Sequence, residues 1–357
     1  MAYTTIDDPS AHFQTTTYTG TGSSGNAITN SGNSDLKPDW LWIKSRSDTE
    51  QHTVWDSSRG STKRLMPDAT NAEYVNSTQG VQSFDTDGFT TGDSDQYNKS
   101  SQSCVAWQWK ANGGTTSSNS NGSITSTVQA NTTAGFSIVT YVSNNTEGAT
   151  FGHGLSSAPE IVIVKGRDSA DNWAVFNGTS TTNSRSFHLD TTDAEIPVSS
   201  YNFWNLYWDE TRPSSTVVTL GVDAKVNKSG NENFVAYCFH SVQGYSKIGK
   251  YTGNGSSSDG PFVYTGFKPA FFLIKSFAAK NWHILDNKRN TINPVNLYLN
   301  PNNTDADGTF TFGDFLSNGF KITNNGNTFN NNGEVYLYYA IAEHPFVSSK
   351  GVPVTAR

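Results

Sequence analysis

The sequence has little charge, little cysteine and no long apolar run. Charged side chains make up 15% of the 357 residues, and 24 Lys and Arg stand against 31 Asp and Glu without forming a basic cluster. Nucleic-acid binding needs clustered Lys and Arg, so this composition argues against such a partner. No stretch approaches the roughly 18 apolar residues of a membrane-spanning helix, and the first residues lack a signal-peptide pattern. We therefore expect a soluble protein without membrane insertion.

Motifs of the common enzyme classes are also missing from the sequence. It contains no Gly-x-Ser-x-Gly elbow, no P-loop and no dinucleotide fingerprint. Its seven histidines are scattered and lack a His-x-x-x-His spacing that would suit a metal. Nothing in the sequence indicates catalysis, and we expect a protein that is not an enzyme.

One phrase, by contrast, occurs three times. A proline, an apolar run and a lysine recur as "LKPDWLWIK", "SAPEIVIVK" and "GFKPAFFLIK", which end at Lys44, Lys165 and Lys275, 121 and then 110 residues apart. An aromatic-led stretch precedes each copy, and a closing aromatic segment follows it, "CVAWQWK", "FVAYCFH" or "YLYYAIAE". This period is too long for a solenoid repeat and predicts three tandem domains.

The short apolar stretches predict an all-β fold. They run four to eight residues, favour Val, Ile, Phe, Tyr, Trp and Thr, and end at Gly, Asn, Asp or Ser clusters. We expect three antiparallel β-sandwiches of the jelly-roll or lectin type, at residues 1–112, 124–243 and 244–357. Residues 113–123 are rich in Gly, Ser and Asn, and we expect them to form a flexible or loosely packed linker.

The repeat also makes two local predictions. Three prolines should occupy the same place, just before a central strand: Pro38, Pro159 and Pro269. Cys104 and Cys238 lie in the closing segments of different repeats, so we expect two buried thiols and not a disulfide.

Taken together, the motifs carry a family resemblance. The stretches "YTGNG", "GFKPAFFLIK" and "NWHILDNKR" of the third repeat, with their counterparts in the first, resemble the repeated β-sandwich domain of marine bacteriophage virion proteins of the cyanophage and pelagiphage type. Those proteins are described as tail-fibre-like, and the domain is similar to the concanavalin-type lectin sandwich. The resemblance implies a virion location, other virion proteins as partners, and assembly as a homo-oligomer, most simply a trimer.

Several polar residues recur at matched places in the repeats. They are Lys44, Asp56 and Arg59 in the first, Lys165 and Asn177 in the second, and Lys275, Asp286 and Arg289 in the third. A lysine at the end of an apolar strand can bury its stem and keep its ammonium group in water, and pairing with the aspartate of the next strand would suit it. The Asp-x-x-Arg spacing predicts a turn held by an ion pair or by an Asx hydrogen bond. These are architectural roles.

The second repeat departs from the others at "NFWNLYWDETRP". Its members with binding chemistry are Trp204, Tyr207, Trp208, Asp209 and Glu210. Sugar rings stack on Trp and Tyr, and acidic side chains bind their hydroxyl groups, so the segment is a candidate glycan-binding platform. The alternative is that its tryptophans pack in the core. Hydrolysis of a glycosidic bond needs two carboxyl groups that flank the bond. Asp209 and Glu210 are adjacent, and adjacent residues of a strand point to opposite faces, so this pair would not share a cleft by itself.

One acidic loop has the oxygen ligands that calcium prefers. Its candidates are Asn303, Asp305, Asp307 and Asp314, although the helices that flank an EF-hand loop are not expected here, and a polar hairpin loop is the alternative. No other cofactor is indicated. Two functions stay open: a tail component that binds host-surface glycan without catalysis, and a capsid-decoration, head-fibre or tail-scaffold protein that binds other virion proteins.

Overall fold

The protein is described by a computed structural model that covers residues 3–181, 186–196 and 207–354. Its described part is almost entirely β, with several antiparallel sheets. Three helices are single turns, η1 (Pro9–Ala11), α1 (Asp95–Asn98) and α3 (Ala224–Asn227), and residues 207–208 are also helical. None of these described helices has the length and apolarity needed to cross a membrane.

The first repeat contains a four-stranded sheet and two smaller ones. Its strands are β1 (Phe13–Thr19), β2 (Asn26–Thr29), β3 (Trp40–Ser45), β4 (Thr53–Asp56), β5 (Lys63–Arg64), β6 (Tyr74–Val75), β7 (Val81–Asp85), β8 (Gly88–Thr91) and β9 (Ser103–Trp109). The main sheet has the order β1-β9-β3-β4, and β2-β8-β7 and β5-β6 form the others. Gly88, which begins β8, has a φ of 111°, and a β-carbon there would collide with the carbonyl oxygen of Ile28.

The second repeat is built on a seven-stranded sheet. Its strands are β10 (Ser117–Asn119), β11 (Ser126–Asn131), β12 (Phe136–Val142), β13 (Ala149–Gly152), β14 (Ile161–Gly166), β15 (Ala174–Asn177), β16 (Ser186–His188), β17 (Val217–Leu220) and β18 (Asn233–Phe239). The large sheet has the order β10-β11-β12-β18-β14-β15-β16, and β13 pairs with β17.

The third repeat has two four-stranded sheets. Its strands are β19 (Ser246–Thr252), β20 (Phe262–Tyr264), β21 (Phe267–Ser276), β22 (Trp282–Asp286), β23 (Val295–Tyr298), β24 (Gly308–Leu316), β25 (Gly319–Ile322) and β26 (Val335–Pro345). The sheets have the orders β19-β26-β21-β22 and β20-β25-β24-β23.

The same run of four strands occurs in every repeat. The orders β1-β9-β3-β4, β12-β18-β14-β15 and β19-β26-β21-β22 each place the closing aromatic strand between the first strand and the lysine-ending strand. The registers match as well, because Trp42 pairs with Trp107, Ile163 with Tyr237, and Leu273 with Tyr339. Each of the three prolines stands two residues before the equivalent residues Trp40, Ile161 and Phe271. Pro38 and Pro159 precede their strands as expected, whereas Pro269 lies inside β21, which begins earlier.

Every lysine-ending strand is buried on both faces, which explains its unbroken apolar sequence. Alternate residues belong to different cores. Trp40, Ile161 and Phe271 join one central cluster that all three repeats share. Their neighbours Leu41, Val162 and Phe272 face three separate clusters, each under the second sheet of their own repeat.

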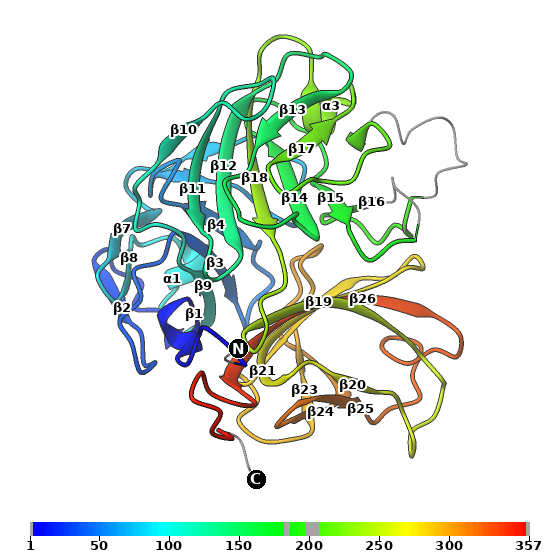
Figure 1. Cartoon of the computed structure of the whole chain (residues 1–357). Coiled ribbons are helices and arrows are strands. Elements are labelled where there is room, and N and C mark those ends of the chain that lie inside the picture. Colours follow the sequence, from blue (N-terminus) through cyan, green and yellow to red (C-terminus); the bar gives the residue numbers. More distant parts are fainter. Residues whose placement is uncertain (1–2, 182–185, 197–206, 355–357) are drawn as a thin grey trace.

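The repeats therefore surround one common centre. Figure 1 shows the first repeat in blue and cyan, the second in green, and the third from yellow to red. Aromatic rings join them there: Trp40 stacks on Tyr237 at 4.6 Å, Phe13 lies 5.3 Å from Phe271, and Phe239 lies 5.1 Å from Tyr339. Burial of so much aromatic surface across the repeats makes the arrangement one packed body.

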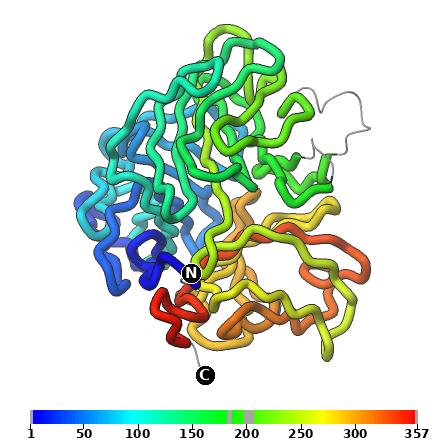
Figure 2. The backbone as a smooth tube through the Cα atoms, in the orientation of Figure 1, coloured from blue at the N-terminus to red at the C-terminus, as the bar shows by residue number. Residues whose placement is uncertain are grey.

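The ends of the described chain close the arrangement. Figure 2 shows the N-terminal and C-terminal segments side by side at the edge of the third repeat. The Tyr3 hydroxyl donates to the carbonyl oxygen of Gly266 at 2.9 Å, and the Ser349 amide donates to the Asp7 carboxylate at 2.7 Å. The first repeat thus contacts the third as well as the second.

The segment expected to be a loose linker is instead packed in place. It contains β10, which pairs with β11. The Gly113 amide donates to Asp39 at 2.8 Å, and the Gly114 amide donates to Gln129 at 2.7 Å. Gly113 and Gly114 have φ angles of 64° and 89°, and a β-carbon at Gly122 would collide with the backbone of Thr150, so these glycines serve a fixed turn and a close approach. Composition alone does not distinguish these uses from flexibility. Cys104 and Cys238 are both buried free thiols, as expected.

Candidate functional site

The three recurring lysines are fully buried. Nζ of Lys44 donates to the carbonyl oxygens of Ser45 and Asp48 at 2.7 and 3.0 Å, and Nζ of Lys275 donates to those of Ser276 and Ala278 at 2.8 and 2.9 Å. The expected wet ammonium groups and the pairing with Asp56 or Asp286 were therefore wrong. The lysines fasten the turn that follows their own strand, because the aspartates are already taken by arginines.

Lys165 differs in reaching across a repeat boundary. Its Nζ donates to the carbonyl oxygen of Thr70 in the first repeat at 3.0 Å, and more weakly to that of Ser169. Burial lowers the pKa of Lys44 and of Lys165 to about 8, and that of Lys275 to about 7. Because these lysines donate to backbone carbonyl oxygens, their buried amino groups have a structural role, and the lowered pKa values are a consequence of that burial.

Both Asp-x-x-Arg turns contain the ion pair and the Asx hydrogen bond. Nε of Arg59 lies 2.6 Å from Oδ2 of Asp56, and its amide donates to Oδ1 at 2.8 Å. The Arg289 and Asp286 pair repeats this at 2.7 and 2.8 Å. All four side chains are fully buried.

Each pair continues into a junction between two repeats. The Glu73 carboxylate accepts a hydrogen bond from Arg59 at 2.8 Å, and both of its oxygens accept from Arg167 of the second repeat. The Tyr237 hydroxyl donates to Asp56 at 2.7 Å. Burial opposes ionisation of Glu73, but the two arginines outweigh it and lower its pKa to about 2. Charge is thus neutralised within the first junction.

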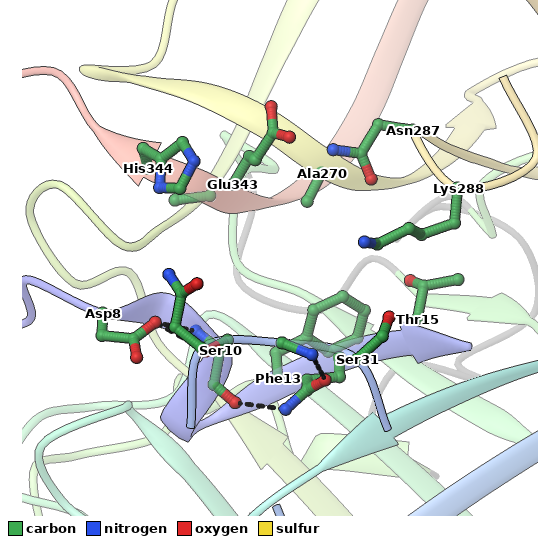
Figure 3. A pocket seen from close by; sticks show the side chains of 14 residues that line it. Asp8, Ser10, Phe13, Thr15, Ser31, Ala270, Asn287, Lys288, Glu343 and His344 are labelled. Atoms are coloured by element: carbon green, nitrogen blue, oxygen red, sulfur yellow. Dashed lines mark hydrogen bonds between the residues drawn. The ribbon is translucent and has the colours of Figure 1, made fainter. Parts of the chain in front are cut away.

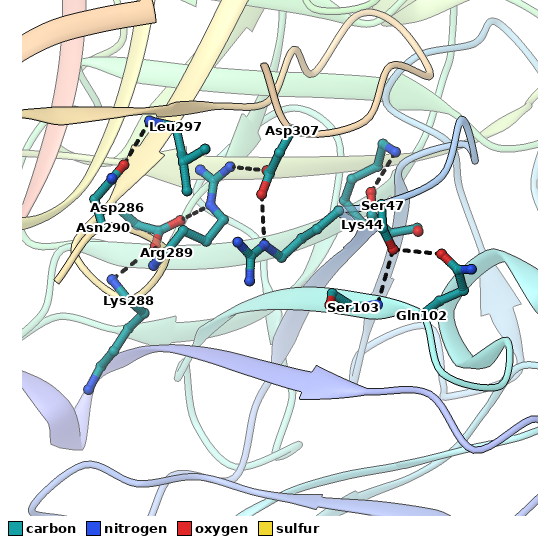
Figure 4. A network of polar contacts seen from close by, with 12 residues as sticks. Lys44, Ser47, Gln102, Ser103, Asp286, Lys288, Arg289, Asn290, Leu297 and Asp307 are labelled. Carbon is teal, nitrogen blue, oxygen red and sulfur yellow. Dashed lines mark hydrogen bonds and ion pairs between the residues drawn. The ribbon is translucent and has the colours of Figure 1, made fainter. Parts of the chain in front are cut away.

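The junction of the third and first repeats has the same design (Figure 4). Asp307 lies between Arg289 and Arg46 of the first repeat, at 2.8 Å from each. Nε1 of Trp107 donates to Asp286 at 3.1 Å, as Tyr237 donates to Asp56. Asp307 therefore belongs to a junction and has no free carboxylate for a metal.

The junction of the second and third repeats is less charged. Asn177 replaces the aspartate and donates from Nδ2 to Glu195 at 2.7 Å. One backbone hydrogen bond nevertheless recurs in all three junctions, from the amide of an acidic residue to a carbonyl oxygen of the neighbouring repeat. The pairs are Glu73 with Arg167 at 2.7 Å, Glu195 with Phe277 at 2.9 Å, and Asp307 with Arg46 at 2.8 Å. Sequence reasoning missed this set, because its members follow the turns at different spacings and share no common residue.

The candidate glycan platform has a buried tryptophan at its centre. Trp208 is fully buried, and its Nε1 donates to the Ser186 hydroxyl at 2.6 Å. Tyr207 is 4% exposed and its hydroxyl lies 3.1 Å from Nε2 of His188. A buried indole offers no face to a sugar, so Trp208 takes the core role that was the alternative. Trp204 lies outside the described residues.

The two acidic neighbours lie in a turn and not on a strand. Asp209 and Glu210 have φ angles of 43° and 50°, in the left-handed region, and follow a short helical turn at 207–208. Asp209 is partly exposed and Glu210 is exposed. The expectation that they point to opposite faces of a strand therefore does not hold.

The candidate calcium loop is stabilised by its own side chains. Nδ2 of Asn303 donates to Asp305 at 2.7 Å, and the Asp305 amide returns to Oδ1 of Asn303 at 3.1 Å. Asp314 lies on β24, and Asp307 is held by two arginines. Within residues 3–181, 186–196 and 207–354, no three His, Cys, Asp or Glu side chains are grouped to hold a metal ion. The loop is a polar turn.

A cleft of about 190 Å³ lies between the first and third repeats (Figure 3). Asp8, Thr15 and Ser31 line it from the first repeat, and Lys288 and His344 face them from the third. Carboxylate, hydroxyl, ammonium and imidazole groups converge here on a small volume. Such a site can bind a small polar ligand through hydrogen bonds.

Comparison with known proteins gives one match. A family model described as a domain of unknown function, DUF7483, matches residues 8–345, so a single family unit spans all three repeats. Searches of curated proteins and of solved structures found no match. The chain belongs to the DUF7483 family.

Proposed function

We propose that this protein is a bacteriophage virion protein, associated with the tail, that binds host-surface glycan without catalysis. In this proposal each repeat is a β-sandwich domain of the lectin type, and the three tandem domains close into one rigid ring. The observation that carries the proposal is that the buried charged residues pair with one another inside the junctions between repeats. Asp56, Arg59, Glu73 and Arg167 are an example. The chain as a whole has few charged residues, 15% of the total, and its loops are rich in Asn, Ser and Thr.

Such loops have the chemistry that sugars require. Hydroxyl and amide groups exchange hydrogen bonds with sugar hydroxyls, and a fixed frame spares the entropic cost of ordering them. Contacts of this kind are weak one at a time. Assembly of several chains on one particle, most simply as a homotrimer, raises the effective concentration and converts weak sites into firm attachment.

Attachment of the purified chain to host cells tests this function. Fluorescently labelled protein should bind the cells and should lose binding after periodate oxidation of the surface glycans, whereas protease treatment of the cells should leave most binding intact. The opposite pattern would identify a protein receptor. Failure to bind untreated cells, even when the protein is presented multivalently on beads, would contradict the adhesive function.

A second function is favoured by the arrangement of the repeats. Three equivalent sheets around one centre give a single chain threefold-like geometry, which matches a partner with a threefold axis. A capsid-decoration, head-fibre or tail-scaffold protein would use it to bind other virion proteins. Cryo-electron microscopy of the virion separates the two functions: copies over the head support decoration, and copies at the distal tail with free loops support the adhesin.

A further inference from the structure

The cleft between the first and third repeats contains polar atoms that the protein leaves unpaired. Thr15 is 4% exposed, and its Oγ1 has no hydrogen-bond partner among the described residues. Oδ1 of Asn287, across the cleft on the turn after β22, is likewise buried without a partner in that part of the chain. Buried polar atoms are normally satisfied, so two unpaired ones lining a single cavity indicate a place for a ligand.

The equivalent place in another junction provides an internal comparison. Ser57 follows Asp56 as Asn287 follows Asp286, so both begin the turn after the same strand. At the first junction Gln129 from β11 fills the space, donating to Ser57 and Ser58 at 3.0 and 2.9 Å. The corresponding space beside Asn287 is the open cleft. The fold can therefore fill this position, as it does between the first and second repeats. Between the third and first repeats the position stays open.

The cleft is held in a fixed shape by its own floor. Gln14 donates to the carbonyl oxygens of Ser10 and Ser34 at 3.1 and 2.7 Å and accepts from the Gly32 amide at 2.8 Å. A side chain at Gly32 would collide with that Gln14 amide. The loop at residues 31–33 is thus set against β1, and the cleft needs no rearrangement to admit a ligand.

The lining combines donors, acceptors and a small apolar surface. Lys288 and His344 supply donors, and Asp8 supplies an acceptor. Glu343 is already paired with Lys268 at 2.7 Å. Phe13, Ala270 and Ala342 form the apolar part. About 190 Å³ corresponds to roughly six waters at about 30 Å³ each, which suits one sugar ring.

We propose that this cleft binds a single neutral sugar residue of a glycan, an inference that rests on the proposed glycan recognition. Thr15 and Asn287 accept hydrogen bonds from its hydroxyl groups, and Lys288 donates to another. The apolar part contacts the C–H face of the ring. A neutral sugar is favoured over an acidic one because the cleft offers no excess of positive charge: Lys288 faces the carboxylate of Asp8, and Glu343 is paired with Lys268.

Saturation-transfer NMR on the full chain, with a panel of methyl glycosides of neutral hexoses and pentoses, tests the site. At least one glycoside should bind. Combining Thr15→Val with Asn287→Ala should weaken its binding about tenfold or more, since each change removes a hydrogen bond to the ligand. Ser57→Ala, at the matched position of the closed junction, should leave binding unchanged.

A measurement without ligand keeps the proposal testable if the variants behave unexpectedly. Thr15→Val keeps the side-chain shape and removes a buried unpaired oxygen, so it should raise the melting temperature. Ser57→Ala breaks satisfied hydrogen bonds and should lower it. A lower melting temperature for Thr15→Val would show that the hydroxyl is paired in the protein, and would overturn the argument for the cleft.

The outcomes separate this site from the function as a whole. Glycoside binding that survives the double variant but is lost in Asp209→Asn with Glu210→Gln would overturn the cleft and leave glycan recognition in place. No glycoside binding, with periodate-sensitive attachment to cells retained, would also overturn the cleft alone. Loss of both glycoside binding and cell attachment in the wild-type chain would reject the proposed function itself.

Discussion

At the scale of single residues, this protein places full charges where water is absent. The Asp56–Arg59 and Asp286–Arg289 pairs are fully buried, and each arginine serves a second carboxylate at a junction. Desolvation of such ions is costly, and the cost is offset only while every partner is present. The pairs therefore contribute more to the choice of which repeats pack together than to net stability.

Arg289→Met should lower the free energy of unfolding by about 3–5 kcal/mol, because Asp286 loses its charge partner in the interior. Lys99→Met is the matched control: it breaks the exposed pair with Asp48 and should lower the free energy of unfolding far less. Urea unfolding followed by tryptophan fluorescence measures both. Equal losses in the two variants would contradict the structural role of the buried pair.

Lys275 predicts a dependence of stability on pH. Burial lowers its pKa to about 7, against 10.5 for the ordinary group, so between these values the unfolded chain binds more protons than the folded one. Its contribution to the free energy of unfolding therefore rises with pH over this window, by up to about 1.4 kcal/mol per pH unit.

The difference in unfolding free energy between wild type and Lys275→Met isolates this lysine from the other titrating groups. It should shift in favour of the wild type from pH 7 to pH 9 in urea titrations. A difference that stays constant across this range would show that the folded protein keeps Lys275 charged at its ordinary pKa.

At the scale of elements, the repeated phrase was sufficient to predict the three lysine-ending strands β3, β14 and β21. "DWLWIK" and its two counterparts are apolar on successive residues, and the structure buries both faces of each strand, one of them in the shared core. Which strands surround a common centre could not be predicted, because a strand covered by its own sheet and one covered by another repeat have the same apolar pattern.

The candidate sites were predictable only where chemistry follows from local spacing. The Asp-x-x-Arg turn is local, so its spacing predicts an ion pair or an Asx hydrogen bond, and the structure contains both. Thr15 and Asn287 come from opposite ends of the chain and meet only in the closed arrangement, so no sequence pattern joins them. Asp307 was assigned to calcium from loop spacing, whereas two distant arginines determine its role.

The start of the segment at residues 113–123 is held in place by a side chain of β11, and this predicts a measurable effect. Gln129 on β11 accepts from the amides of Asn112 and Gly114 at 3.1 and 2.7 Å. Gln129→Ala should cost about 1–3 kcal/mol and should increase hydrogen exchange at both amides, because their buried acceptor is removed. Fast exchange of these amides in the wild type would restore the interpretation of the segment as a loose linker.

At the scale of the whole molecule, the shared core decides whether the repeats can fold separately. The central cluster takes residues from every repeat, among them Trp42, Ile163 and Leu273, so removing one repeat would expose aromatic surface on the other two. Three sandwiches joined only by short connections would each keep a complete core of their own. The two organisations predict different unfolding behaviour.

We expect the full chain to unfold in one cooperative transition, with equal calorimetric and van't Hoff enthalpies, because loss of any repeat uncovers the central cluster. A chain truncated after residue 243 should fail to reach a native near-ultraviolet circular dichroism spectrum, whereas a chain ending at 354 should keep it. Placing Trp42→Ala in the full chain should lower the single transition without splitting it. Separate transitions, or a truncated chain that unfolds cooperatively with the wild-type midpoint, would show that the repeats are independent domains and that the shared core contributes little to their stability.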